Sequence, residues 1–140
     1  MMDHAALSAL ARISEPEFQA APFGGIIVDR TGKIEQYNAY ESQLAQLAPE
    51  RVIGKDFFHT VAPCTAVKAF EGRFYEFLEL DDVVSESFAY FFPFAHEDAN
   101  VIVSFVKRAG SESVLIVVER VDEAAAAPLQ DCYSPILPPE

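Results

Sequence analysis

Alternating and continuous runs of apolar residues predict five β-strands in this chain of 140 residues. The first two strands are expected over 24–29 and 33–37, and the last three over 87–95, 100–107 and 113–121. Within 87–95 the aromatic residues Phe88, Tyr90, Phe92 and Phe94 fall at every second position, which is typical of a strand with one buried face. Residues 114–118 are all apolar, which indicates a central strand covered on both faces.

Helical patterns lie between the second and third predicted strands. Asn38 is expected to cap a helix over 39–47, and Asp56 one over 57–61. The longest helical pattern spans 66–80, where apolar residues recur four positions apart. Two strands, short helices, one connecting helix and three strands predict an α+β domain with a five-stranded antiparallel sheet.

Three parts of the chain differ in composition. Residues 1–21 are expected to form a cap that contains a short helix, interrupted at Pro16, which must dock on the rest of the protein to be stable. Residues 22–121 contain the predicted domain. Residues 122–140 are rich in alanine and proline, which predicts a disordered tail.

Composition and charge narrow the class of protein. Hydrophobic residues make up 51% of the chain, but no apolar stretch approaches the ~20 residues that cross a bilayer. The N-terminus lacks the pattern of a secretory signal, so we expect a cytoplasmic protein. A net charge of −12 repels phosphate backbones and anionic lipids, which argues against nucleic acid and membrane as partners.

Three residues are candidates for chemistry: Tyr37 and Glu41, four positions apart where a strand gives way to a helix, and Cys64. Each also has an ordinary structural interpretation, as a core tyrosine, a solvated glutamate and a small buried cysteine. No spacing rule joins Cys64 to the other two. From these residues alone, the function stays open.

A resemblance changes this interpretation. It rests on the segments QYNA at 36–39, VIGKDFF at 52–58 and VAPCT at 61–65. These segments closely resemble the photoactive yellow protein family, and the likeness covers roughly residues 20–121. The resemblance implies a PAS domain that senses blue light and is not an enzyme.

The same resemblance implies that p-coumaric acid is attached to Cys64 as a thioester. Its phenolate would accept hydrogen bonds from the Tyr37 hydroxyl and the Glu41 carboxyl, and the backbone N–H of Cys64 would hold the thioester carbonyl. A carboxyl donates only when protonated, and burial favours that form. The hypothesis is that light isomerises the pigment and breaks the hydrogen bonds of its phenolate, and that Glu41 then gives the phenolate a proton. The unpaired carboxylate left behind would loosen the N-terminal cap.

Four positions depart from the family pattern or add to it. Ala45 replaces a threonine that commonly supports the tyrosine, and Leu47 replaces an arginine that closes the pocket mouth. We therefore expect an absorption maximum and a dark-recovery rate unlike those of typical members. His96 is either a solvated loop histidine or a group near the pigment that makes recovery depend on pH. Cys132 is expected to be an exposed free thiol.

Two other functions remain open at this point. The chain could be a PAS module that binds a small ligand or another protein without a pigment. A Cys64-dependent enzyme is a weaker alternative, because no histidine, asparagine or aspartate is recognisably placed to activate the thiol. As no output domain is recognisable after Val121, the resemblance implies signalling to a separate, unidentified protein.

Overall fold

The five strands form one antiparallel sheet in the order β2-β1-β5-β4-β3. The structure is a computed structural model, and it describes residues 3–45, 47–92 and 99–120. The strands are β1 (Gly24–Val28), β2 (Ile34–Tyr37), β3 (Ser85–Phe92), β4 (Ala99–Lys107) and β5 (Val114–Arg120). The predicted α+β class and five-stranded antiparallel sheet are confirmed, and β5 is the central strand, as its continuous apolar run predicts.

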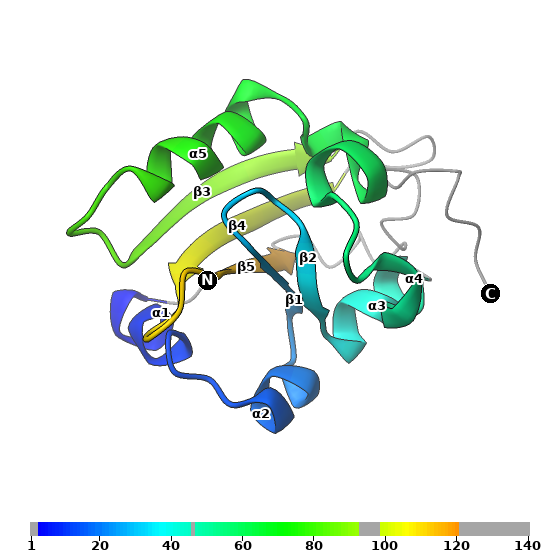
Figure 1. Ribbon diagram of the computed structural model, residues 1–140, viewed down its shortest axis with the longest axis horizontal. Coiled ribbons are helices and arrows are strands. Elements are labelled where there is room, and N and C mark those ends of the chain that lie inside the picture. The colour runs from blue at the N-terminus through cyan, green and yellow to red at the C-terminus, as the bar shows by residue number, and fades with distance from the viewer. Residues whose placement is uncertain (1–2, 46, 93–98, 121–140) are drawn as a thin grey trace.

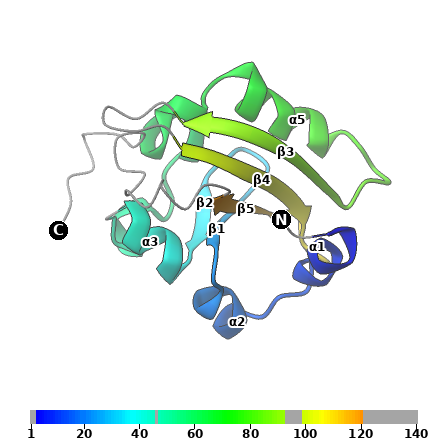
Figure 2. The same ribbon diagram turned by 180° about the vertical axis from the view of Figure 1, so that it is seen from behind.

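Short helices cover both faces of this sheet. They are α1 (His4–Leu10), α2 (Glu15–Ala20), α3 (Ala39–Ala45), α4 (Pro49–Val52), η1 (Phe57–Val61), η2 (Pro63–Thr65), η3 (Lys68–Gly72) and α5 (Arg73–Leu78). Figure 1 shows α5 along β3 on one side of the strands and α1 on the other side, and Figure 2 shows the same arrangement from behind. None of the helices in the described part of the chain is long and apolar enough to cross a membrane.

Two hydrophobic clusters, one on each face of the sheet, hold these layers together. The main core lies under α3–α5 and contains a group of packed phenylalanine rings, including Phe58, Phe70, Phe74 and Phe105. The second cluster joins the N-terminal helices to the opposite face through Leu7, Ile13 and Phe18. Burying each of these three side chains contributes about 1.5–3 kcal/mol, which is how so short a segment stays docked.

The prediction that Pro16 interrupts the N-terminal segment is wrong. Pro16 lies in the first turn of a second helix, α2, whose N-cap is Ser14. Ser14 and Glu17 form a reciprocal capping box, in which the backbone N–H of Ser14 reaches the Glu17 carboxylate at 3.0 Å. Proline lacks an N–H, but the first turn of a helix has no partner for that group, so proline starts this helix without loss.

The predicted helix over 66–80 is also corrected. Its first part is a π-helical turn, η3, that begins only at Lys68 because Val67 is extended (φ −137°, ψ 163°). The regular α-helix, α5, follows and ends at Leu78. Phe70 and Phe74 are nonetheless fully buried, so the apolar spacing identified the correct face. The predicted helix over 39–47 ends at Ala45.

Candidate functional site

Tyr37 and Glu41 are both buried, on two consecutive elements. Tyr37 is the last residue of β2 and is 1% exposed, and Glu41 lies in the first turn of α3 and is 0% exposed. Asn38, between them, caps the helix, as predicted. Tyr37 itself is therefore not helical, and the strand-to-helix junction brings the two side chains to the interior.

Asn38 is the polar centre of this junction. Its side-chain oxygen accepts hydrogen bonds from the backbone N–H groups of Gly25, at 3.0 Å, and Glu41, at 2.9 Å. Its amide nitrogen donates to the carbonyl oxygens of Phe23, at 2.9 Å, and Phe18, at 3.2 Å. Asn38 therefore ties the helix that carries Glu41 to strand β1 and to α2. The sequence predicted the cap but not these other contacts.

The burial of Glu41 determines what its carboxyl group can do. A carboxylate removed from water is destabilised, so a buried site favours the neutral acid. The neutral acid has an O–H group and can donate a hydrogen bond, as the Tyr37 hydroxyl can. A phenol and a carboxylic acid together are a donor set that fits a buried anionic oxygen, such as a phenolate.

Cys64 lies in a chain of short helices at the edge of the main core. It belongs to η2 and is partly buried against the core. Its carbonyl oxygen accepts a hydrogen bond from the Tyr90 hydroxyl at 3.0 Å. The Tyr90 ring packs edge-on against Phe70, 5.1 Å between centroids. Burial raises the pKa of Tyr90, so its hydroxyl stays protonated and keeps donating to Cys64.

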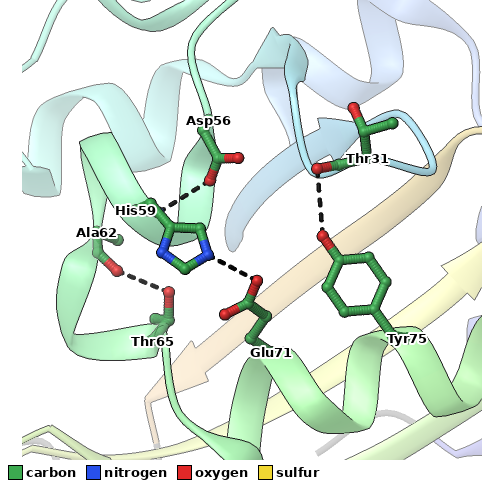
Figure 3. Close-up of polar contacts among 7 residues, drawn as sticks. All are labelled: Thr31, Asp56, His59, Ala62, Thr65, Glu71 and Tyr75. Carbon is green, nitrogen blue, oxygen red and sulfur yellow. Dashed lines mark hydrogen bonds and ion pairs between the residues drawn. The ribbon is translucent and has the colours of Figure 1, made fainter.

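Polar contacts also hold the segments on either side of Cys64 (Figure 3). His59 of η1 contacts Glu71 of η3, with 2.8 Å between Nε2 and a carboxylate oxygen. The Thr65 hydroxyl donates to the Ala62 carbonyl at 2.6 Å, and the backbone N–H of His59 donates to Asp56 at 2.9 Å. The segment that carries Cys64 is thus fixed at both ends.

A shallow hollow lies outside this segment. Its volume is about 310 Å³, and it is lined by Ala66, Val67, Lys68, Glu71, Gly72 and Tyr75. None of the predicted site residues lines it.

The hydroxyl of Tyr75, one of the lining residues, donates to the Thr31 carbonyl at 3.2 Å (Figure 3). Burial, and to a lesser extent the nearby carboxylates, raises the pKa of Tyr75. In the described part of the chain, no cluster of three or more metal-binding side chains occurs.

The sulfur of Cys64 is engaged in a disulfide in this structure. Two cysteines in the sequence did not lead us to expect one. Cys132, predicted to be a free thiol, lies outside the described residues. A thioester forms only from the thiolate, so acylation of Cys64 requires that the disulfide first be reduced.

The remaining predicted site residues are Leu47, Ala45 and His96. Leu47 is 3% exposed and packs in the same core cluster as Tyr37. Its backbone is held by Ser42, whose hydroxyl donates to the Leu47 carbonyl at 2.7 Å. Ala45 is the last residue of α3. His96 lies outside the described residues.

Sequence reasoning missed Tyr90 as a site residue. It counted Tyr90 only as one of the alternating aromatic residues of a strand. A core-facing tyrosine needs a partner for its hydroxyl, and that requirement is the signal that could have indicated a contact. The partner, the Cys64 carbonyl, is 26 residues away and could not be read from spacing.

Comparison with known proteins identifies the relatives of this chain. A scan against protein-family models finds no match. Photoactive yellow protein from Halochromatium salexigens is 36% identical over 113 residues, which cover 81% of this chain and 90% of that protein. The protein of the same name from Cereibacter sphaeroides is 36% identical over 100 residues, covering 71% and 80%. The chain belongs to the photoactive yellow protein family.

Solved structures agree with this assignment. The photoactive yellow protein domain of the sensor histidine kinase Ppr from Rhodospirillum centenum superimposes with a TM-score of 0.68 at 36% identity, covering 76% of this chain and 93% of that domain. The PAS domain of the Cronobacter turicensis receptor RpfR has a TM-score of 0.58 at 17% identity, covering 73% and 96%. The predicted family and PAS fold are therefore confirmed, and the chain is a PAS domain of a photoreceptor family.

Proposed function

We propose that this protein is a blue-light photoreceptor that carries p-coumaric acid as a thioester on Cys64. The observation that carries the proposal is the complete burial of Tyr37 and Glu41 on consecutive elements, in a member of this family. Two buried hydrogen-bond donors can stabilise a phenolate that would otherwise be too costly to remove from water. When bound, the p-coumaroyl group supplies the absorption of blue light and the isomerisation.

The residues of the chain divide the remaining tasks. Cys64 supplies the covalent anchor, and Tyr90 holds its carbonyl so that the anchor keeps one orientation. Tyr37 and Glu41 donate hydrogen bonds to the phenolate oxygen. Cys64 forms its bond once and does not turn over, so the protein is not an enzyme under this proposal.

The response begins when the Glu41 carboxyl gives its proton to the phenolate oxygen, which becomes a neutral phenol. The carboxylate left behind is an uncompensated charge in the interior, which costs several kcal/mol. Glu41 lies in the first turn of α3, where the helix dipole stabilises a negative charge by about 0.3–1 kcal/mol. The cost exceeds this stabilisation, so the structure around Glu41 must change.

Asn38 can transmit a structural change at Glu41 to the N-terminal helices. It bonds the backbone N–H of Glu41 and also the Phe18 carbonyl of α2. A shift of the first turn of α3 therefore strains the contact that holds the N-terminal helices. We propose that these helices loosen in the light and that the sheet face beneath them binds a separate signalling protein.

Two further expectations belong to this proposal. A reducing compartment such as the cytoplasm would keep Cys64 able to accept the chromophore. Ala45 and Leu47, which replace the threonine and arginine common in the family, would shift the absorption maximum and the rate of dark recovery. Restoring them as Ala45→Thr and Leu47→Arg should move both quantities toward those of typical members.

Reconstitution tests the proposal. Reduced apoprotein is mixed with an activated ester of p-coumaric acid, and absorbance and the mass at Cys64 are measured, with Cys64→Ala as the control. The proposal predicts a blue-absorbing band that bleaches in light and recovers in the dark, with the added mass on Cys64. A pigment-free PAS module, the alternative, would show no band even with the thiol reduced.

A further inference from the structure

Strand β1 begins with two adjacent glycines that face opposite sides of the sheet. Gly24 shares its face with Ile26, which belongs to the main core. Gly25 shares its face with Ile27, which belongs to the cluster under the N-terminal helices. Neither glycine has the positive φ that would by itself require glycine, so the reason for their small size lies in their neighbours.

The neighbour of Gly24 is the carboxyl group of Glu41. A methyl group added at Gly24 would overlap the Glu41 Oε1 atom, well inside van der Waals contact. The same methyl group would lie 3.5 Å from the Val118 Cβ, an ordinary distance. The Glu41 carboxyl therefore occupies the space that any side chain at position 24 would fill.

We infer that Gly24 is a positioning residue for the Glu41 carboxyl. Because Gly24 has no side chain, the carboxyl can pack directly against the backbone of β1. The inference rests on the proposed function, because it concerns the donor to the phenolate. With alanine at position 24, the carboxyl would have to retreat by about 1 Å to reach van der Waals contact. Hydrogen bonds are lost over such a displacement. The carboxyl is the end of a flexible side chain, so it can move while the fold stays intact.

Gly25 provides a matched control on the other face. A methyl group there would lie 2.7 Å from the Phe18 ring and 3.1 Å from the Asn38 amide nitrogen. Phe18 belongs to α2, and Asn38 joins α2 to the backbone N–H of Glu41, so neither is the carboxyl group that a methyl group at Gly24 would meet. The substitution Gly25→Ala should thus disturb mainly the N-terminal helices, and it should move the Glu41 carboxyl less than Gly24→Ala does, because it reaches Glu41 only through Asn38.

The test compares Gly24→Ala and Gly25→Ala with the wild-type protein. In the apoprotein, ¹³C NMR follows the side-chain carboxyl carbon of Glu41, assigned by its loss in Glu41→Gln. In the loaded protein, the absorption maximum reports the hydrogen bonds to the phenolate. We expect Gly24→Ala to change the Glu41 signal and to shift the band to longer wavelength, because losing a donor destabilises the negative charge on the phenolate oxygen. Gly25→Ala should produce a smaller change in both the Glu41 signal and the absorption maximum than Gly24→Ala does, and should increase proteolysis of the N-terminal helices.

A double variant separates an effect through Glu41 from any other. In a Glu41→Ala background the carboxyl is gone, so adding Gly24→Ala should cause no further spectral shift. The double variant should also melt at a higher temperature than Gly24→Ala alone if that single variant is unstable. The inference would be overturned if Gly24→Ala shifted the absorption maximum equally with and without the Glu41 carboxyl. It would also be overturned if Glu41→Ala failed to raise the melting temperature of an unstable Gly24→Ala variant.

The two proposals fail in different ways. If the wild-type protein takes up no chromophore, the photoreceptor proposal fails, and the NMR signal of Glu41 in the apoprotein still decides the role of Gly24. If the wild-type protein is loaded normally and folded Gly24→Ala matches it in both the NMR signal and the absorption maximum, only the inference about Gly24 fails.

Discussion

The side-chain oxygen of Asn38 accepts a hydrogen bond from the backbone N–H of Glu41 across 2.9 Å. Through its amide nitrogen, the same side chain holds the carbonyl of Phe18 in α2. One buried residue therefore joins the acid at the centre of the proposed site to the N-terminal helices that are proposed to loosen. This arrangement makes the route of the signal testable before any partner is known.

Replacing Asn38 with serine separates its two roles. Serine can still cap α3 but is too short to reach the buried Phe18 carbonyl and the partly buried Phe23 carbonyl, which both lose this donor. We expect Asn38→Ser to lower the free energy of unfolding by about 1–3 kcal/mol. Amide hydrogen exchange in α2 should accelerate more than exchange in β5.

Asn38→Ala is the comparison for this variant. Alanine also removes the cap, so it should cost roughly 1 kcal/mol more than serine. If α2 in Asn38→Ser exchanged as slowly as in the wild-type protein, the contact with Phe18 would not hold the N-terminal helices.

The hydrogen bond from Tyr90 to the Cys64 carbonyl is tested by Tyr90→Phe. The substitution keeps the ring against Phe70 but removes the donor, so we expect the protein to lose about 1 kcal/mol of stability in urea unfolding. Tyr75→Phe is the control, since it removes an exposed hydrogen bond to Thr31. A loss for Tyr90→Phe no larger than for Tyr75→Phe would contradict the role given to Tyr90.

Asp29 predicts a dependence of stability on acid pH. Burial acts to raise the pKa of Asp29, but hydrogen bonds from Thr31 and Lys33 together outweigh it and lower the pKa. Because the folded pKa lies below the unfolded one, this carboxylate stabilises the fold above about pH 4, and the stabilisation is lost as the pH falls below that.

The measurement is the difference in unfolding free energy between wild type and Asp29→Asn. This difference should be largest near pH 6 and should shrink steadily toward pH 2, since only the charged carboxylate accepts these hydrogen bonds fully. Asp82→Asn, at an exposed position before β3, is the control. A difference for Asp29→Asn that stays constant with pH would show that its hydrogen bonds do not depend on its charge.

The disulfide at Cys64 predicts a dependence of pigment loading on reductant. Apoprotein purified without reductant should take up little p-coumaroyl group, and addition of a thiol reductant should restore uptake, because only the thiolate attacks the activated ester. Intact mass before and after reduction is the measurement. Equal uptake by oxidised and reduced apoprotein would mean that the disulfide does not form on Cys64 in solution.

Much of the fold was predictable from local patterns. The alternation of aromatic residues placed β3, and the continuous apolar run placed β5 at the centre of the sheet. These predictions succeed because side-chain periodicity follows directly from which faces are buried. The prediction for Pro16 was wrong because proline breaks a helix only in its interior and is tolerated in the first turn. The capping box of Ser14 and Glu17 places Pro16 in the first turn of α2.

The site was predictable only in part. Tyr37 and Glu41 were identified through the family resemblance, and their burial follows from the strand-to-helix junction. The contacts of Asn38 with α2, of Tyr90 with Cys64, and of Gly24 with Glu41 all join segments far apart in the sequence. No local pattern encodes such contacts, because they depend on how the layers of the fold are packed.

The central claim is that Glu41 holds a proton in the dark and releases it in the light. The most direct measurement is the light-minus-dark infrared difference spectrum of the loaded protein, compared with that of Glu41→Gln. We expect the wild-type protein to lose a protonated carboxyl C=O band on illumination and Glu41→Gln to lack that change. The same band loss in Glu41→Gln, or none in the wild-type protein, would contradict the account.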